Sequence, residues 1–284
     1  MTLTVADLNL ADPRAGGGLP GTSSDSDLYL VKLTDPPKEG TGYGKEKYSV
    51  YFGHLADPKG NLTYNGFGGA GFDTQLDFIG AALKQYTYRD GGAVIDLELN
   101  YFDGKIDGTG TANPDISGIA ALAGVSASLK PGKTVGLTVV YGSGQDPAKD
   151  PAMGGDININ ALSGNYSLGN ILLDTSINSD RDGQSLNVGG ARIMAVKVSA
   201  DCAKDEKRSL GVAIIWAETT ENASAAISSR DLGVEVDGNA TIKLDDNLEL
   251  AAGVGYLIAG DAWKAFKGDD GDAIKLHTAV VLTF

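Results

Sequence analysis

The sequence predicts an all-β protein that forms one antiparallel, up-and-down transmembrane β-barrel over residues 1–284, with about twelve strands or, alternatively, fourteen. Three observations support this prediction. Many segments alternate apolar and polar side chains with a period of two, the repeat of a β-strand with one apolar face. Short turns alternate along the chain with long polar links. No apolar run approaches the roughly 18 residues of a membrane helix, so helical spans are excluded.

The composition narrows the class of protein further. There are 40 glycines but only 9 prolines and no G-x-y period, which argues against collagen and against a disordered Pro-rich chain. Cys202 is the single cysteine, and His54 and His277 lie in unrelated contexts, so neither an intrachain disulfide nor a Cys/His zinc site is indicated. The net charge of −14 disfavours nucleic acid as a partner. The first residues lack the features of a signal peptide, and we therefore expect the mature form of an exported protein.

The clearest predicted strand covers residues 232–244. Its even positions are apolar or small, whereas its odd positions include Glu235, Asp237 and Lys243. A strand tilted across a bilayer needs about 9 to 11 residues, and a soluble core would not require an amphipathic strand of this length. Residues 245–247 then form a short turn, and residues 248–258 return with their apolar row on the even positions.

The same alternation predicts the other strands. They cover residues 48–55, 72–88, 93–102, 119–129, 135–141, 194–200, 210–216 and 272–284, with noisier patterns near 2–10 and 27–33. In the strand that begins at residue 72, we place Leu76 and Phe78 on the outward apolar face and Asp73 and Asp77 on the inward face.

The connections provide a second pattern. Short links lie at about 89–92, 130–133, 203–208 and 245–247, and longer polar links lie at about 104–114, 142–190, 220–230 and 260–271. Bacterial outer-membrane barrels show this asymmetry, with short periplasmic turns, long outer loops and an even number of strands. We expect the 142–190 link to be an extracellular or lumen-folded loop. It could instead contain an extra strand pair near residues 165–177, which would raise the count to fourteen.

The last strand carries a family resemblance. Residues 272–284 alternate and end on the aromatic Phe284, and this resembles the closing strand of Gram-negative outer-membrane barrels. Residues 230–237, 244–250, 253–263 and 169–174 are similar to stretches in the C-terminal part of porins related to the alginate-export family. The resemblance implies a bacterial outer-membrane location and insertion by the outer-membrane assembly machinery through the C-terminal strand. Members of that family are usually longer and have a strongly basic lumen, which this chain lacks.

Aromatic residues near strand ends predict where the membrane interfaces lie, because Trp and Tyr favour the borders of a bilayer. The predicted interface residues are Tyr29, Tyr48, Tyr101, Tyr141, Trp216, Tyr256 and Phe284. A weaker interpretation is that aromatic residues favour strands in any case.

The inward face predicts the chemistry of a pore. The predicted pore-lining residues are Asp73, Asp77, Asp96, Glu98, Lys197, Asp231, Glu235, Asp237, Lys243, Glu249, Lys275 and His277. Acidic side chains outnumber basic ones, and in a narrow wet pore this excess concentrates cations. The alternative is that inward acids and lysines pair across strands and leave little net field.

These patterns lead to a functional prediction. We expect an outer-membrane channel for passive diffusion of small solutes or ions, weakly cation-selective, with no cofactor, no metal and no enzymatic activity. Its partners would be the lipid bilayer and the solutes that cross it. Two alternatives stay open: a structural or ligand-binding barrel with a plugged lumen, and a soluble all-β binding protein.

Overall fold

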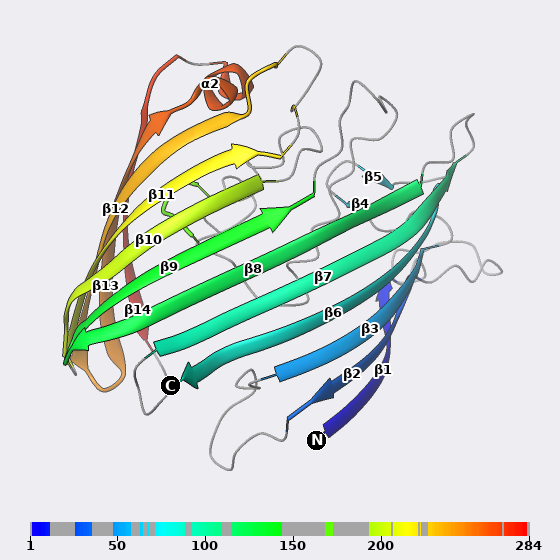
Figure 1. Ribbon diagram of the computed structural model, residues 1–284, viewed down its shortest axis with the longest axis horizontal. Coiled ribbons are helices and arrows are strands. Elements are labelled where there is room, and N and C mark those ends of the chain that lie inside the picture. Colours follow the sequence, from blue (N-terminus) through cyan, green and yellow to red (C-terminus); the bar gives the residue numbers. More distant parts are fainter. Residues whose placement is uncertain are drawn as a thin grey trace.

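The computed structural model contains a single large antiparallel sheet (Figure 1). It describes residues 2–11, 26–35, 48–57, 63–64, 67–68, 72–88, 93–108, 115–143, 168–172, 193–205, 207–220, 222, 227–268 and 270–282. Within these residues, twelve strands pair in the order β1-β2-β3-β6-β7-β8-β9-β10-β11-β12-β13-β14. Each strand pairs with its neighbours in the chain, apart from the small β4–β5 hairpin, which forms its own sheet. The predicted all-β, up-and-down fold with twelve strands is confirmed.

The element bounds are as follows. The sheet consists of β1 (Thr2–Ala11), β2 (Ser26–Thr34), β3 (Tyr48–Asp57), β6 (Phe72–Tyr88), β7 (Ala93–Gly108), β8 (Asp115–Lys130), β9 (Lys133–Gly142), β10 (Ile193–Lys204), β11 (Arg208–Thr219), β12 (Asp231–Asp245), β13 (Leu248–Ala259) and β14 (Ala273–Leu282). The hairpin consists of β4 (Thr63–Tyr64) and β5 (Phe67–Gly68), and the helix α2 covers Asp261–Lys267.

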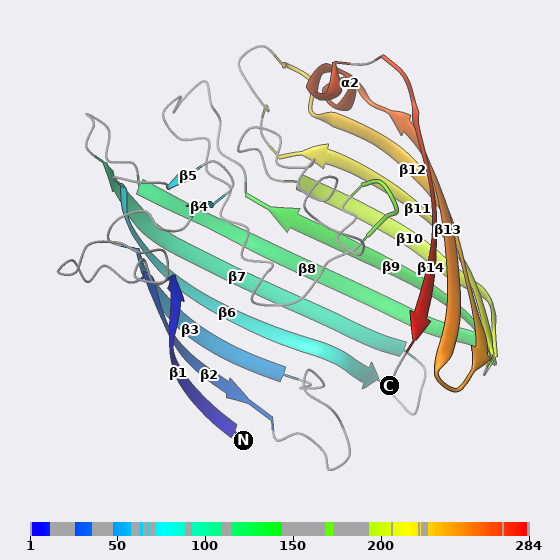
Figure 2. The same ribbon diagram turned by 180° about the vertical axis from the view of Figure 1, so that it is seen from behind.

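The sheet is strongly curved, and β1 and β14 form its two edges (Figures 1 and 2). Among the described residues, β1 pairs with β2 and β14 pairs with β13. Both chain ends lie toward the end of the sheet opposite α2 (Figure 2). Closure of the barrel between β1 and β14 stays a prediction.

Short turns join the strands at one end of the sheet, as expected. The turn between β8 and β9 contains Pro131 and Gly132, and Gly132 has a φ of 73°. A type II turn favours Pro at its second position and requires positive φ at its third, so the sequence Lys-Pro-Gly-Lys selects this geometry. β2 ends and β3 begins at this same end with residues 35–47 between them in the sequence, and this length is an exception to the predicted asymmetry.

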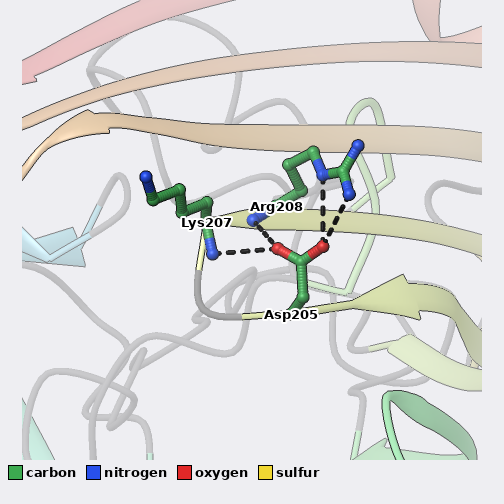
Figure 3. Close-up of polar contacts among 3 residues, drawn as sticks. All are labelled: Asp205, Lys207 and Arg208. Atoms are coloured by element: carbon green, nitrogen blue, oxygen red, sulfur yellow. Dashed lines mark hydrogen bonds and ion pairs between the residues drawn. The ribbon is translucent and has the colours of Figure 1, made fainter.

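A carboxylate organises the turn between β10 and β11 (Figure 3). Asp205 accepts hydrogen bonds from the backbone N–H groups of Lys207 and Arg208 at 2.9 and 2.7 Å. Its other oxygen accepts bonds from Nε and Nη2 of Arg208 at 3.1 and 2.9 Å. The backbone N–H of Lys207 and the Arg208 side chain lower the pKa of Asp205 below its ordinary value. The predicted charged turn at 203–208 is therefore a specific, hydrogen-bonded structure.

The two faces of the sheet differ in exposure along many of its strands. In β3, Val50 and Phe52 are 54% and 50% exposed, whereas Tyr51 and Leu55 are 6% and 5% exposed. We call the face that carries Val50 and Phe52 the convex face and the other the concave face. In β11, Ile214 on the convex face is 55% exposed and Ile215 on the concave face is fully buried. The period of two in the sequence thus separates an uncovered apolar face from a covered one.

The predicted orientation of the first part of β6 is wrong. Leu76 and Phe78 are buried on the concave face, and Asp77 lies on the convex face with Ile79. Asp73 shares the parity of Asp77 and is therefore also on the convex face. The physical reason is that β6 is 17 residues long, so its polar convex positions extend beyond the apolar band that begins at Ile79.

A β-bulge also changes one predicted orientation in β12. Leu232 is the first even position of the apolar row predicted for residues 232–244, but it is only 1% exposed. The pairing of β11 with β12 shifts register next to Glu218, and Gly233 adopts a φ of 115°. A bulge with glycine at positive φ rotates the preceding residues, and this directs Leu232 to the concave face.

The 142–190 link is described only in part. Residues 168–172 are outside any strand, and residues 144–167 and 173–190 lie outside the described residues. Within 168–172 the alternative of an extra strand pair is not observed.

Candidate functional site

The most specific polar cluster on the concave face holds the segment Leu168–Leu172. Glu235 of β12 accepts hydrogen bonds from the backbone N–H groups of Asn170 and Ile171 on Oε1, at 2.8 and 2.7 Å. It accepts a third bond from the N–H of Leu172 on Oε2, at 2.6 Å. Three consecutive N–H groups therefore converge on one carboxylate, an arrangement that binds anionic oxygen well.

Neighbouring strands add further contacts to the segment. The N–H of Asn170 also lies 3.1 Å from Asp237 Oδ2, and its side-chain amide donates to the carbonyl of Val254 at 3.0 Å. Lys197 of β10 donates from Nζ to the carbonyl of Leu168 at 2.6 Å. Side chains from β10 and β12 thus hold the main chain of one short segment against the wall, and a carbonyl from β13 holds the Asn170 side chain.

The two carboxylates of this cluster are covered by the segment. Glu235 is 0% exposed and Asp237 is 2% exposed. Asp237 Oδ1 is buried and has no hydrogen-bond partner among the residues that the structure describes. Burying a charge is costly unless it is paired and hydrogen-bonded, so the donors of the segment are essential to keep Glu235 in this position.

Glycines allow the close approach of the segment to the wall. A Cβ atom at Gly169 would lie 2.5 Å from Glu235 Oε2 and 2.8 Å from the carbonyl oxygen of Leu172. A Cβ atom at Gly255, on β13, would lie 2.9 Å from oxygens of both Glu235 and Asp237 and 3.0 Å from Cβ of Asn170. The contact surface is therefore shaped for main chain, with little space for additional side-chain atoms.

Apolar side chains pack on the same part of the concave face. The buried cluster comprises Leu168, Leu172, Ile193, Ala195, Ala213, Ile215, Ala217, Leu232, Leu257, Ala259, Ala262 and Trp263. It combines the segment, the ends of β10–β13 remote from the short turns, and α2. Trp263 is further covered by Lys267, whose Nζ lies 5.1 Å from the ring centroid. This part of the wall is filled with packed side chains.

A second polar network lies on β3 and β7. The hydroxyl of Tyr51 donates to Asn100 Oδ1, and Asn100 Nδ2 donates to Glu98 Oε1 at 2.9 Å. All three residues are buried, and Gly80 leaves the space that the Tyr51 ring and Asn100 occupy. Tyr51 and Asn100 were not among the predicted pore residues, because the sequence does not show which strands a hydrogen-bond network connects.

The concave face nearer the short turns has a different character. On β8–β11 it carries small and hydroxylated residues that are all half-buried: Gly124, Ser126, Thr134, Gly136, Thr138, Ser199, Asp201, Ser209 and Gly211. Thr134 donates from Oγ1 to Asp201 Oδ2 at 2.6 Å. We call this surface the polar wall. Asp96 belongs to it, because its Cβ lies 3.6 Å from the position that a Cβ at Gly124 would occupy.

The structure brings only some of the predicted pore residues together. Lys197, Glu235 and Asp237 meet at the segment, and Asp96 and Glu98 lie on β7 at different depths of burial.

The other predicted pore residues are more dispersed. Asp231 is exposed at the start of β12, and Lys243 is exposed and 3.3 Å from Asp246 in a short turn. Glu249, Lys275 and His277 are half-buried on β13 and β14.

The predicted interface aromatics lie on the convex face. Tyr29, Tyr48, Tyr101, Tyr141 and Tyr256 are between 42% and 49% exposed. Trp216 shares the convex parity of Ile214 and is half-buried, and Phe284 lies outside the described residues. Tyr256 donates to Asp272 Oδ2 at 2.7 Å beyond the strand end, and this bond, with the N–H of Ala259, lowers the pKa of Asp272.

A histidine–carboxylate pair also lies on the convex face. Nδ1 of His54 is 2.8 Å from Asp77 Oδ1, and the imidazole stacks on Tyr29 with ring centroids 6.3 Å apart. Among the described residues there is no group of three metal-ligating side chains. In the described part of the chain, no helix is sufficiently long and apolar to cross a membrane.

Comparisons with known proteins give two findings. No protein-family model and no curated protein matches the chain. Among solved structures, outer membrane phospholipase A from Escherichia coli is similar at 9% identity, with a TM-score of 0.34, over 99% of this chain and 88% of that chain. The transport unit of the autotransporter AIDA-I from Escherichia coli is similar at 13% identity, with a TM-score of 0.30, over 93% of this chain and 78% of that chain. The resemblance to porins of the alginate-export family stays a prediction.

Proposed function

We propose that the protein is an outer-membrane channel for passive diffusion of small polar solutes or ions, weakly cation-selective and without enzymatic activity. This proposal rests on the residues of the chain itself. The polar wall of β8–β11 is the observation that carries it, because a half-exposed surface of small and hydroxylated side chains on the covered side of a curved sheet is suited to a water-filled path.

The convex face supports the membrane part of the proposal. Large apolar side chains on many strands are exposed there, including Val198 at 56%, Leu99 at 56% and Ile258 at 53%. A soluble protein rarely exposes a continuous apolar surface of this extent, whereas a barrel in lipid requires one. Tyr48 near the short turns and Tyr101, Tyr141 and Tyr256 toward the other end fit the two borders of such a band. The lipid bilayer and the assembly machinery, which would recognise the C-terminal strand, are therefore the proposed partners.

Charges on the concave face support weak cation preference. Asp73 and Asp77 lie on the convex face and therefore do not line the path. Asp57 of β3 and Asp201 of β10 lie on the concave face and add two carboxylates in their place. Carboxylates inside low-dielectric walls attract cations and repel anions. A preference for cations is the expected result, because acids outnumber lysines on this face among the described residues when the buried Asp57, Glu98, Glu235 and Asp237 are counted.

Planar-bilayer recording tests both parts of the proposal. Purified protein is expected to produce stepwise conductance increases in KCl, and a tenfold KCl gradient is expected to give a reversal potential of the sign that K⁺ preference requires. The convex-face variant Asp103→Asn is a matched control, since it removes one carboxylate outside the path and is expected to leave the reversal potential unchanged. Anion preference would refute the charge argument. Absence of any conductance step would refute the open path.

A plugged structural barrel is the second candidate, and one observation favours it. The segment Leu168–Leu172 and α2 bury twelve residues in one cluster against β10–β13. If this packing occluded the whole path, the protein would insert into bilayers without conducting. Tight inward packing of Val94, Phe102, Leu122 and Ile215 would also favour a plugged barrel. Ile215 is fully buried, Val94 and Leu122 are half-buried, and Phe102 lies outside the described side chains.

A further inference from the structure

We propose that the segment Leu168–Leu172 is a gate that leaves its position on Glu235 reversibly, and that the open state is more cation-selective than the closed state. This inference rests on the channel function proposed above. It adds a moving part and links its position to the ions that cross.

The way in which the segment is attached supports a reversible contact. The segment is outside the β-ladder, and its recorded bonds to the wall come from three side chains and one carbonyl. Glu235 alone accepts three of the backbone N–H groups. Within the described residues, release of the segment therefore needs no strand pairing to break, and one carboxylate controls most of the polar contact.

The internal geometry of the segment makes it a compact unit. The N–H of Gly169 donates to the carbonyl of Leu172 at 3.0 Å, which closes a turn within the segment. The turn presents its remaining N–H groups to Glu235 and its two leucines to the apolar cluster. Because these contacts lie together on one turn, they are expected to form and break together.

The charges that the segment covers connect its position to ion selectivity. With the segment in place, Glu235 and Asp237 are almost fully buried and Lys197 is bonded to Leu168. Of the described charges that stay at least partly exposed on the concave face, the carboxylates of Asp96, Asp201 and Glu249 are matched in number by Lys32, Lys243 and Lys275. Lys130 adds a positive charge at the β8–β9 turn, so no excess of negative charge is exposed.

Departure of the segment would uncover two carboxylates and one lysine, which is a net gain of one negative charge on the path. A wider path with a stronger negative field conducts more and prefers cations more strongly.

A reversible disulfide tests the gate in the full-length protein. Cβ of Asn170 lies 3.0 Å from the position of a Cβ at Gly255, so a small shift reaches the roughly 3.5–4.5 Å of a disulfide. A Cβ at Gly255 also lies 2.9 Å from oxygens of Glu235 and Asp237, so Gly255→Ala is the control that shows the effect of this crowding without a covalent bond. The protein would carry Asn170→Cys and Gly255→Cys together with Cys202→Ser, which removes the single native thiol. Oxidised protein is expected to show only the low-conductance state in planar bilayers. Dithiothreitol added to the same membrane is expected to restore transitions to a higher state with a reversal potential shifted toward that of K⁺.

A single-residue variant gives an independent test without new thiols. Glu235→Gln removes the charge that accepts the three N–H groups, and the occupancy of the high-conductance state is expected to rise at least about tenfold. Asp103→Asn on the convex face removes one carboxylate away from the gate and is expected to leave the occupancy unchanged.

The possible outcomes separate the gate from the channel. If neither wild type nor any variant conducts before or after reduction, the channel function fails and the gate fails with it. If all conduct, but reduction and Glu235→Gln leave the state occupancies unchanged, the gate is overturned and the channel function stands. If the states interconvert with identical reversal potentials, the link to selectivity is overturned.

Discussion

Substitution of Gly169 by alanine is expected to detach the Leu168–Leu172 segment from the wall. The added Cβ would lie 2.5 Å from Glu235 Oε2, the oxygen that accepts the N–H of Leu172 at 2.6 Å, and 2.8 Å from the carbonyl of Leu172. Real Cβ atoms do not approach neighbours this closely, so the carboxylate or the turn must move.

The size of the effect follows from the cost of overpacking. Forcing an extra methyl group into a packed site typically costs about 1–3 kcal/mol. If this cost falls on the docked state alone, the ratio of undocked to docked segment rises by about 5- to 150-fold, since about 1.4 kcal/mol corresponds to a factor of ten. The strands themselves are expected to retain their stability, because residue 169 lies outside the sheet.

Amide hydrogen exchange measures this ratio directly. The N–H groups of Asn170, Ile171 and Leu172 are all hydrogen-bonded to Glu235 in the docked segment. Their exchange is expected to accelerate by the same factor of about 5 to 150 in Gly169→Ala when exchange proceeds through undocking. Mass spectrometry of the peptide that contains them, in detergent-solubilised protein, provides the measurement.

Gly211→Ala is the matched control. Gly211 also lies on the concave face, on β11, but a Cβ there would be 3.5 Å from its nearest neighbour, Asp201 Oδ1, which is an ordinary contact. Exchange of residues 169–172 is expected to be unchanged in this variant. Unaltered exchange in Gly169→Ala, or equal acceleration in both variants, would refute the reasoning about the shape of the contact.

Three further predictions concern the sheet. Val5 and Leu282 are both exposed on the convex face near the short-turn end of the edge strands β1 and β14. If these two edges pair in a bilayer, the double variant Val5→Cys with Leu282→Cys is expected to form a cross-link. No cross-link beyond that of Val5→Cys alone would refute this closure. Asp205→Asn is expected to lower the thermal midpoint at pH 7. The lowered pKa of Asp205 contributes stability that is present above its unfolded-state pKa of about 3.9 and is lost as the pH falls through its folded-state pKa. The difference from wild type should therefore vanish in acid. A constant difference from pH 7 to pH 3 would contradict this. Gly53→Ala is expected to destabilise the sheet by about 1–3 kcal/mol, because its Cβ would overlap the ring of Phe78; an unchanged denaturation midpoint would show that the ring has room to move.

Much of the architecture follows from the sequence because a period of two is a local property. The alternation in residues 232–244 and 248–258 identifies β12 and β13 almost to their ends, and the turn residues Pro131 and Gly132 mark the β8–β9 connection. The predicted orientation of side chains fails where a strand extends beyond the apolar band of the sheet. In β6, Asp77 and Leu76 alternate as expected, but alternation alone does not show which parity faces inward when a strand extends beyond the apolar band.

The candidate site depends on contacts between distant parts of the chain. The residues of the 168–172 segment resemble a loop, but nothing in their sequence indicates that Glu235, more than sixty positions later, accepts their N–H groups. In the same way, the sequence shows Asp237 and Lys197 as inward charges, and only the fold buries them beneath the segment.

By itself, the sequence determined that the chain forms about twelve antiparallel strands with an apolar face and left fourteen as an alternative, because side-chain alternation and turn chemistry act over a few residues. The tertiary structure decided which carboxylates remain accessible, because hydrogen-bond donors and covering side chains come from segments far apart in the chain. Glu235 shows the difference: its parity in β12 follows from the sequence, and its role as the acceptor for Leu168–Leu172 arises only when β10–β13 and that segment pack together.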